Sequence, residues 1–264
     1  QRITKSFKTE DFSGEDVVLL RGVKLSFGNT PILNGIDLLV KRNDRLALIG
    51  NNGSGKTTLL RLINGELKPD EGIVRIGASV KVGYLPQHVV FDNPELTVLD
   101  TVRHELITDE GTARNILAGF MFRGEDVFKT VDNLSGGERS RLKLCLLMQQ
   151  QVNLLILDEP TNHLDIQSRE WIEEALDDFE GTILFVSHDR YFIRKFASSI
   201  CELEDGKLLF FDGDYESFRE YKRALGEEKK RVAAESRKEE KPRQERIKRP
   251  SPKALEKKLA AIEA

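Results

Sequence analysis

The sequence lacks several features that would assign it to common protein classes. No apolar run approaches the roughly 20 residues that span a bilayer, and residues 1–7 contain no apolar core of the signal-peptide kind. We therefore expect a protein that does not insert into a membrane and that works in the cytoplasm. Only two cysteines are present, Cys145 and Cys201. Because they have no metal-ligand spacing, we expect them to be buried, reduced thiols.

The chain also lacks a large net charge, so its overall charge gives no argument for nucleic-acid binding. Its 264 residues, 39% hydrophobic and 32% charged, suffice for one large core or two smaller ones. The net charge of −3 is unevenly distributed. Residues 226–264 contain 13 Lys and Arg against 8 Asp and Glu, a net of +5, which leaves −8 for the remainder. A basic tail thus follows an acidic body. Because the first residue, Gln1, is not an initiator methionine, we expect the sequence to be either a piece of a longer chain or a trimmed chain.

Residues 50–58, Gly-Asn-Asn-Gly-Ser-Gly-Lys-Thr-Thr, fit the pattern G-x-x-x-x-G-K-[ST] and are called the phosphate loop below. A short apolar run precedes the loop, as a buried strand would, and residues with helical apolar spacing follow it. Glycines let the backbone curl so that N–H groups point at phosphate oxygens, next to the positive end of a helix. Lys56 can reach the β- and γ-phosphates, and the Thr57 hydroxyl can ligate Mg²⁺. The sequence therefore predicts a nucleotide phosphate site rather than a turn that only starts a helix.

Two adjacent carboxylates, Asp158 and Glu159, follow the apolar run 154–157. At the carboxyl end of a strand, Asp158 can hold Mg²⁺ through water, opposite Thr57. Glu159 can then accept a proton from the attacking water or orient it. The alternative is an acidic turn on the surface, which the phosphate loop upstream makes the weaker interpretation.

Three other positions allow both a functional and a structural interpretation. The turn 135–137, Ser-Gly-Gly, precedes a helix and would either bind an anion or simply cap the helix. His188 follows an apolar strand and would either reach a γ-phosphate or be structural. Phe27 would either stack on a purine or belong to the core. Gln87 lies where the strand pattern gives way to helices and means nothing by itself.

The apolar periodicity and the turn residues predict an α/β fold. The early strands favour a small antiparallel sheet, and the later alternation of strands and helices favours a mostly parallel sheet. The expected strands are 17–27, 36–40, 46–49, 73–76, 80–85, 152–157 and 182–186, with a turn at 28–31 and a hairpin at 198–212. The expected helices are 58–63, 98–106, 113–122, 136–148, 168–179 and 214–225.

Together these residues resemble the ATP-binding cassette superfamily over roughly Val17–Tyr221, with the motifs in the family's order. They are the A-loop aromatic Phe27, Walker A Gly50–Thr57, Q-loop Gln87, signature Leu134–Glu138, Walker B Asp158, catalytic Glu159, D-loop Leu164-Asp165 and switch His188. The resemblance implies a P-loop nucleotide hydrolase with a helical subdomain, with ATP and Mg²⁺ as cofactors. It implies catalysis by Glu159, His188, Lys56 and Gln87, and a metal site at Thr57, Gln87 and Asp158. The implied nucleotide contacts are Phe27, Gly50, Asn51, Asn52, Gly53, Ser54, Gly55, Lys56, Thr57, Thr58, Ser135, Gly136 and Gly137.

Within that superfamily, the motif Asp-Glu-Pro-Thr-Asn-His-Leu-Asp at residues 158–165 resembles the corresponding motif of the ABC-F group. Members of that group carry two cassettes in one chain and act on ribosomes. Residues 122–128 and the stretch 211–215 before a charged helix also look like that group. The resemblance implies a second cassette as partner, in the same chain or a homodimer, arranged head to tail. It also implies the ribosome, with its rRNA and tRNA, as a target, and antibiotic-resistance ribosome protection as one possible role. The alternative is the nucleotide-binding subunit of a membrane transporter.

The expected domain organisation follows from this resemblance. Residues 1–14 are expected to end a linker, and residues 15–225 to form the cassette, with a helical subdomain at about 88–140. Residues 226–264 are expected to form a charged tail, partly helical or disordered. Because the stretch between Gln87 and Leu134 has no room for a long insert, the chain reads as the second of two cassettes.

Overall fold

A computed structural model describes residues 14–162 and 164–228 of the chain. The chain divides into two units, residues 1–216 and residues 217–264. The predicted linker end at 1–14 lies almost wholly outside the described residues, as does the predicted tail beyond residue 228. The proposed boundary at 225 therefore stays a prediction.

A three-stranded antiparallel sheet has the strand order β2-β1-β4. Its strands are β1 (Asp16–Phe27), β2 (Thr30–Lys41) and β4 (Glu71–Ile76). β2 begins six residues before the predicted strand, so the predicted turn shortens to Gly28 and Asn29. Pro31 is tolerated inside β2 because β2 is an edge strand, where a residue without an N–H leaves no ladder partner unsatisfied.

A six-stranded sheet has the order β5-β6-β7-β3-β8-β9, in which every pairing except β8 with β9 is parallel. Its strands are β3 (Arg45–Ile49), β5 (Val82–Leu85), β6 (Leu154–Asp158), β7 (Thr182–Val186), β8 (Ser199–Glu204) and β9 (Lys207–Asp212). All five residues of β6 and all five of β7 are buried, as expected for central strands of a covered parallel sheet.

Chain order places the strand predicted at 80–85 among the early, antiparallel strands, and this prediction is wrong. The corresponding strand, β5, pairs in parallel with β6. Lys81 and Asn153 explain the pairing, because the Lys81 N–H donates to Asn153 Oδ1 at 2.8 Å and the Asn153 N–H donates to the Lys81 carbonyl at 3.0 Å. These bonds fix the start of β5 beside the start of β6.

Three helices accompany the two sheets, namely α1 (Lys56–Ile63), α5 (Ile166–Asp177) and α6 (Arg190–Phe196). One buried core contains Leu59 and Leu60 of α1 together with side chains from both sheets, so α1 is packed against both. α5 begins two residues before the predicted helix because Asp165 caps it, accepting from the Ser168 N–H at 2.7 Å. The sequence pattern did not predict the seven-residue helix α6.

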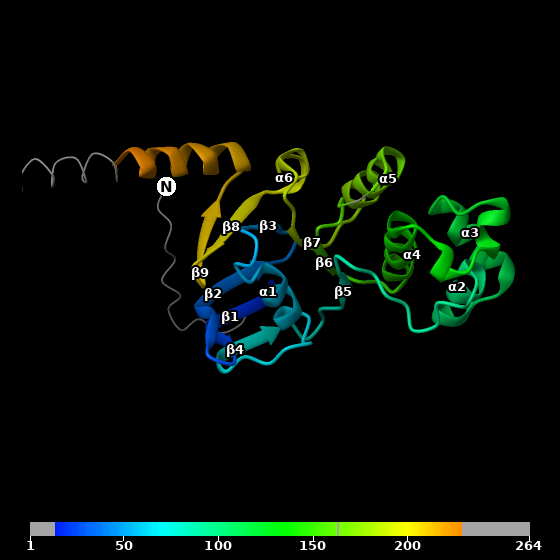
Figure 1. The fold of residues 1–264 in the computed structure, drawn as a ribbon, viewed down its shortest axis with the longest axis horizontal. Helices are drawn as coiled ribbons and strands as arrows, with labels where there is room; N and C mark the ends of the chain where they lie inside the picture. Colours follow the sequence, from blue (N-terminus) through cyan, green and yellow to red (C-terminus); the bar gives the residue numbers. More distant parts are fainter. Residues whose placement is uncertain (1–13, 163, 229–264) are drawn as a thin grey trace, which may run out of the picture. The chain divides into compact units, whose positions relative to one another are not determined.

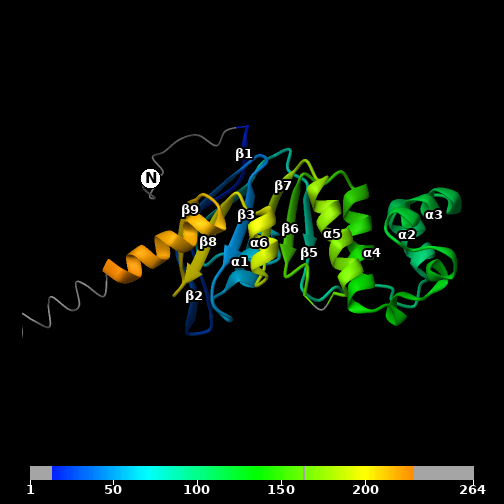
Figure 2. The same ribbon diagram turned by 90° about the horizontal axis from the view of Figure 1, so that it is seen from above.

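A helical subdomain, residues 98–149, has a separate buried core, which includes Leu117 and Leu142. Its elements are α2 (Val98–Leu106), α3 (Glu110–Gly119), η1 (Gly124–Phe128), η2 (Val131–Asn133) and α4 (Gly136–Gln149). Figures 1 and 2 show α2 and α3 on the side of α4 that faces away from the sheet. α2 matches its prediction. α3 begins and ends three residues early, because Asp109 caps its start and accepts from the Thr112 N–H at 3.0 Å.

Residues 215–228 are helical, which agrees with a helix predicted at 214–225. Among the residues that the structure describes, no helix is both long enough and apolar enough to cross a membrane.

Candidate nucleotide site

Four parallel strands end at one edge of the six-stranded sheet, and predicted site residues lie at or just after each of these ends. Gln87 comes after β5, Asp158 ends β6, His188 comes after β7, and Gly50 comes directly after β3. These strands are neighbours in the order β5-β6-β7-β3. Since the carboxyl ends of parallel strands lie at the same edge, the fold gathers residues that are far apart in sequence.

The phosphate loop leaves this edge between β3 and α1 and has no room for a side chain at two of its glycines. A Cβ on Gly50 would lie 2.3 Å from the Leu203 carbonyl oxygen in β8. Gly55 has a φ of 101°, and a Cβ there would lie 2.7 Å from Cγ2 of Ile32 in β2. The loop therefore passes closely between β8 and β2. Ser54 Oγ is buried in it without a hydrogen-bond partner, so a bound oxygen would find an unused donor there.

Lys56 begins α1 and turns its ammonium group back onto the phosphate loop. Its Nζ donates to the carbonyl oxygens of Gly50 and Asn51, each at 2.9 Å. Burial lowers the pKa of Lys56, whereas the carboxylates of Glu159 and Asp158 act to raise it. The loop's own backbone thus holds the ammonium group against the loop.

The other predicted loop residues are accessible. Asn52 and Gly53 are exposed, and Thr58 is half-buried in the first turn of α1. Gly53 has a φ of 77° with open space where a Cβ would lie. The loop therefore offers its backbone to a ligand without bulky side chains in front of it.

Asp158 lies beside Thr57, and the Thr57 side chain acts to lower the pKa of the Asp158 carboxyl. Asp158 is buried, and its Oδ2 has no hydrogen-bond partner. Burial raises the pKa of Asp158, while the neighbouring Thr57 side chain and the charges of Lys56 and His88 act to lower it. A buried, unpartnered carboxylate oxygen beside a hydroxyl fits Mg²⁺, which takes few protein ligands and keeps several waters. Residues 14–162 and 164–228 contain no cluster of three or more His, Cys, Asp or Glu that could hold a metal.

Glu159 and His188 face each other at the ends of β6 and β7. Glu159 Oε2 accepts from the His188 N–H at 3.2 Å, and His188 Nε2 lies 3.4 Å from Glu159 Oε1. Oε1 is buried and has no partner of hydrogen-bond geometry. Glu159 also has a φ of 53°, a left-handed backbone that is uncommon for a residue other than glycine. Its N–H donates to the Val186 carbonyl at 3.0 Å, which fixes this conformation against β7.

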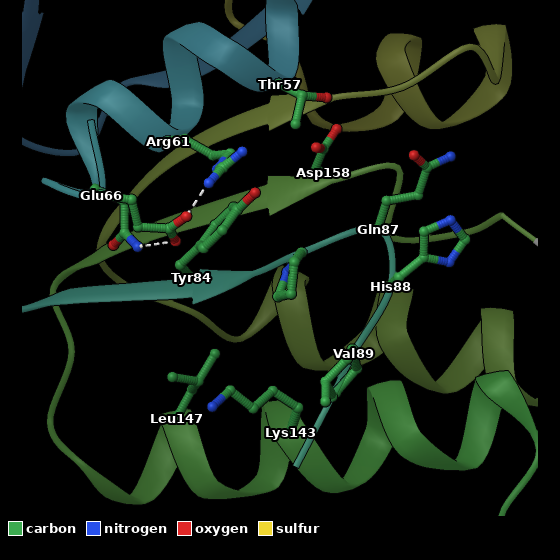
Figure 3. A pocket seen from close by; sticks show the side chains of 13 residues that line it. Thr57, Arg61, Glu66, Tyr84, Gln87, His88, Val89, Lys143, Leu147 and Asp158 are labelled. Atoms are coloured by element: carbon green, nitrogen blue, oxygen red, sulfur yellow. Dashed lines mark hydrogen bonds and ion pairs between the residues drawn. The ribbon is translucent and has the colours of Figure 1, made fainter. Parts of the chain in front are cut away.

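A cavity of about 580 Å³ opens beside Thr57 and Asp158 (Figure 3). The exposed Gln87 side chain lies at the same end of the cavity as these two residues (Figure 3). The structure therefore brings the three predicted metal residues together. The lining residues are Thr57, Arg61, Asn64, Glu66, Tyr84, Pro86, Gln87, His88, Val89, Val90, Lys143, Leu147 and Asp158.

Sequence reasoning missed several residues of this cavity. No sequence pattern assigns a role to His88, although it follows Gln87 and its charge acts on Asp158. Arg61 pairs with Glu66 at 2.8 Å on the cavity wall. Lys143 comes from α4, and no local pattern in the sequence could have linked it to Thr57.

Phe27 ends β1 and is 52% exposed, so the interpretation of Phe27 as a core aromatic is wrong. It pairs with Thr30 across the hairpin, two residues before Ile32, whose methyl group lies against Gly55. An exposed aromatic ring thus lies on the hairpin that flanks the phosphate loop, where it is available to stack on a base.

The turn 135–137 precedes α4 and forms a capping box. Ser135 Oγ accepts from the Glu138 N–H at 3.2 Å, and Glu138 Oε2 accepts from the Ser135 N–H at 2.8 Å. Among the cavity residues, α4 contributes Lys143 and Leu147, and Ser135 lies about 12 Å before Lys143 along the helix. The turn is thus separate from the cavity that contains Thr57.

The two glycines of this turn differ in their surroundings. Gly136 has open space where a Cβ would lie. A Cβ on Gly137 would lie 3.1 Å from Cδ2 of Leu164, in the loop before α5. Gly137 therefore allows α4 to lie close to that loop.

Comparisons with known proteins agree with this arrangement. A family profile described as "ABC transporter" matches residues 33–162. The chain is 44% identical over 216 residues to a "Putative ATP-binding protein YdiF" of Bacillus subtilis (strain 168), covering 80% of this chain and 33% of that protein. It is 36% identical over 220 residues to the "Energy-dependent translational throttle protein EttA" of Escherichia coli O6:H1, covering 81% of this chain and 40% of that protein. The chain thus spans one third to two fifths of the length of these relatives.

Two further similarities concern the subfamily and the fold. The chain is 37% identical over 214 residues to "ABC transporter F family member 2" of Arabidopsis thaliana, covering 79% of this chain and 31% of that protein. A solved structure titled "Structure of ATP binding subunit of ABC transporter" superposes with a TM-score of 0.68 at 21% identity, covering 80% of this chain and 93% of that one. At this identity the structural match supports the fold alone.

Proposed function

Because this chain belongs to the ATP-binding cassette superfamily, among relatives of the ABC-F group, we propose that it binds and hydrolyses ATP with Mg²⁺ as one cassette of a two-cassette protein that acts on the ribosome. The observation that carries the proposal is the convergence of Gln87, Asp158, His188 and the phosphate loop at one sheet edge.

ATP binding rests on the phosphate loop and α1. The loop's N–H groups and the positive end of α1 suit phosphate oxygens. Lys56 supplies the cation, and phosphate oxygens would replace the carbonyl oxygens of Gly50 and Asn51 as its acceptors. Phe27 would stack on the adenine from the flanking hairpin.

The metal would be held by Asp158, Thr57 and Gln87. When bound, Mg²⁺ supplies positive charge that balances the β- and γ-phosphates during phosphoryl transfer. The unpartnered Asp158 Oδ2 is the donor that the fold leaves for this role.

Hydrolysis would use Glu159 as the general base, with His188 beside it. Glu159 Oε1 is buried and has no hydrogen-bond partner, so it is free to accept the proton of an attacking water. His188 is held 3.4 Å away by the strand pairing of β6 with β7 and would contact the γ-phosphate. Lys56 would stabilise the charge that develops on the transferred group.

The signature turn 135–137 would act on ATP held by another cassette. In its capping box the Ser135 oxygen accepts a hydrogen bond, so its hydroxyl proton is still available as a donor. Since α4 carries this turn away from the cavity that contains Thr57, a head-to-tail partner would bring a second phosphate loop to it. We propose that this chain is the second cassette of the two-cassette protein.

Action on the ribosome is proposed from the relatives and from charge. One relative is called a translational throttle protein. Residues 226–264 carry 13 Lys and Arg against 8 Asp and Glu, which suits contact with rRNA phosphates. A ribosome-protection role in antibiotic resistance is one form that this action could take.

The experiment uses the two-cassette protein with Glu159→Gln, which should keep MgATP bound while slowing turnover roughly 100-fold or more. The protein is recovered from a cell lysate with MgATP and, separately, without nucleotide. We expect rRNA and ribosomal proteins to be retained only with MgATP, and to be released by salt. Recovery of a membrane permease instead would overturn the ribosomal assignment, and wild-type turnover in the variant would overturn the role of Glu159.

A further inference from the structure

An ion-pair network joins α5 to α6 next to the proposed catalytic pair. Arg169 of α5 pairs with Asp189, and its Nε contacts Glu173 Oε1 at 3.1 Å. Glu173 is buried, and its Oε2 accepts from Lys195 Nζ of α6 at 3.2 Å. Lys195 also pairs with Asp177 at 3.0 Å. Arg169 and Lys195 thus share the buried carboxylate of Glu173. Of these two cations, only Arg169 also pairs with Asp189.

Asp189 is the residue after His188 and the N-cap of α6. Its Oδ1 accepts from the Tyr191 N–H at 2.8 Å and from the Phe192 N–H at 3.4 Å. Its own N–H donates to Ser187 Oγ at 3.0 Å. The Asp189 carboxylate therefore fixes the turn from β7 into α6, and that turn carries His188.

Asp189 uses its two carboxylate oxygens for different partners. Asp189 uses Oδ1 for the helix N–H groups and Oδ2 for Nη2 of Arg169. The Arg169 guanidinium also lies 5.6 Å from the Tyr191 ring centroid, within cation–π range. The guanidinium is thus fixed by a carboxylate on its own helix, by Asp189 on the turn and by the Tyr191 ring in the first turn of α6.

We propose that Arg169 is a positioning residue for the hydrolysis reaction, holding His188 at Glu159 by way of the Asp189 carboxylate. The inference rests on the proposed ATPase function. His188 itself is the more exposed member of the pair, with 57% of its side chain accessible against 10% for Glu159, so its backbone turn must set its position. That turn is what Arg169 contacts.

A purely structural role for the network predicts a different outcome. If the ion pairs only joined α5 to α6, Arg169 and Lys195 would be equivalent, because each makes an ion pair between the two: Arg169 with Asp189 at the start of α6, and Lys195 with Glu173 of α5. Lys195→Gln is therefore the matched control. It removes a cation from the same buried carboxylate and leaves the Asp189 contact in place.

The experiment compares Arg169→Gln, Lys195→Gln and Arg169→Lys in the two-cassette protein, measuring kcat, KM for ATP and Tm. We expect Arg169→Gln to lower kcat roughly tenfold with KM unchanged, since misplacing a reacting group slows the chemical step without weakening binding. Lys195→Gln should lower Tm to a similar extent with kcat unchanged. Arg169→Lys should recover part of kcat, because a lysine can still pair with Asp189.

A double variant tests whether the effect passes through His188. In a His188→Ala background, Arg169→Gln should cause no further loss of kcat, because the residue it positions is gone. An equal tenfold loss in that background, or equal losses of kcat for Arg169→Gln and Lys195→Gln, would overturn the inference. If the wild-type protein itself does not hydrolyse ATP, the proposed function fails instead, so the two failures are distinguishable.

Discussion

The two parts of the proposed nucleotide site differ in how their polar groups are satisfied. At the sheet edge, Ser54 Oγ, Asp158 Oδ2 and Glu159 Oε1 are buried without hydrogen-bond partners. They are three of the four such side-chain atoms among the described residues. At the start of α4, by contrast, Ser135 and Glu138 satisfy each other in a capping box. The buried polar atoms at the sheet edge thus lack hydrogen-bond partners, whereas the polar groups at the start of α4 bond to each other.

This difference indicates that the sheet edge is arranged to bind a ligand, whereas the turn before α4 is arranged to cap a helix. A buried polar group without a partner costs on the order of 1–3 kcal/mol, so the ligand-free sheet edge lowers the stability of the fold. A ligand that supplies the missing partners recovers that free energy, and the sheet edge should therefore be strongly coupled to nucleotide. The capped turn gains nothing from a ligand on its own cassette.

Lys56→Ala should have the largest effect on nucleotide binding. It removes the buried cation of the phosphate loop, and a charge-assisted hydrogen bond of this kind contributes up to about 3 kcal/mol, or roughly a 100-fold change in Kd. The measurement is the Kd of this chain for a fluorescent ATP analogue with Mg²⁺. Lys24→Ala is the control, because Lys24 lies in β1 and pairs with Glu71 on the surface. Equal affinity of Lys56→Ala and wild type would disprove the loop assignment.

Asp158→Asn should be more stable than the wild type without nucleotide and less stable than the wild type with MgATP. Burial raises the pKa of Asp158, so its contribution to stability is present below its unfolded pKa and is lost as pH rises through the folded pKa. At neutral pH the variant should therefore melt above the wild type, by roughly 2–4 °C per kcal/mol recovered. With MgATP the wild type should melt higher, because the variant has lost the carboxylate that holds the metal.

The pH dependence gives the control for this reversal. In the absence of nucleotide, the advantage of Asp158→Asn should shrink as the solution is acidified, because the wild-type carboxyl then becomes neutral as well. Asp109→Asn serves as comparison, because hydrogen bonds with Thr112 lower the pKa of that exposed cap. A MgATP-induced rise in Tm that is the same in wild type and Asp158→Asn would contradict the metal site.

The sequence predicted the site residues at the sheet edge better than the neighbouring residues that position and line the site. The sheet-edge residues follow short apolar runs, and because such runs form parallel strands, their carboxyl ends place Gly50 and Asp158 at the same edge of the sheet. The pairing of β5 with β6 depends on Asn153, which contacts Lys81 across 72 positions, and no local pattern reveals it. The same holds for Lys143 of α4 in the cavity wall.

Phe27→Ala should have an intermediate effect that separates the base from the phosphates. The ring is half-exposed, so its loss should change Tm little, whereas stacking on a base contributes about 1 kcal/mol or more by alanine substitution. We expect the Kd for ATP to rise by roughly tenfold, and the Kd for inorganic triphosphate to stay unchanged. Phe128→Ala, another half-exposed phenylalanine, is the control. An equal loss for ATP and triphosphate would exclude stacking.

Ser135→Ala should have the smallest effect, with no change in nucleotide binding by this chain. This result would separate the turn before α4 from the sheet edge most clearly. The hydroxyl caps α4, and loss of such a cap costs about 1 kcal/mol, so Tm should fall by roughly 2–4 °C. Ser135→Thr keeps the hydroxyl and should restore most of that stability. In the two-cassette protein the alanine variant should in addition slow turnover, because there its hydroxyl would meet ATP held by the other cassette. A weaker Kd of this chain alone would show that the turn reaches its own phosphate loop, and the two parts would then form one site within a single cassette.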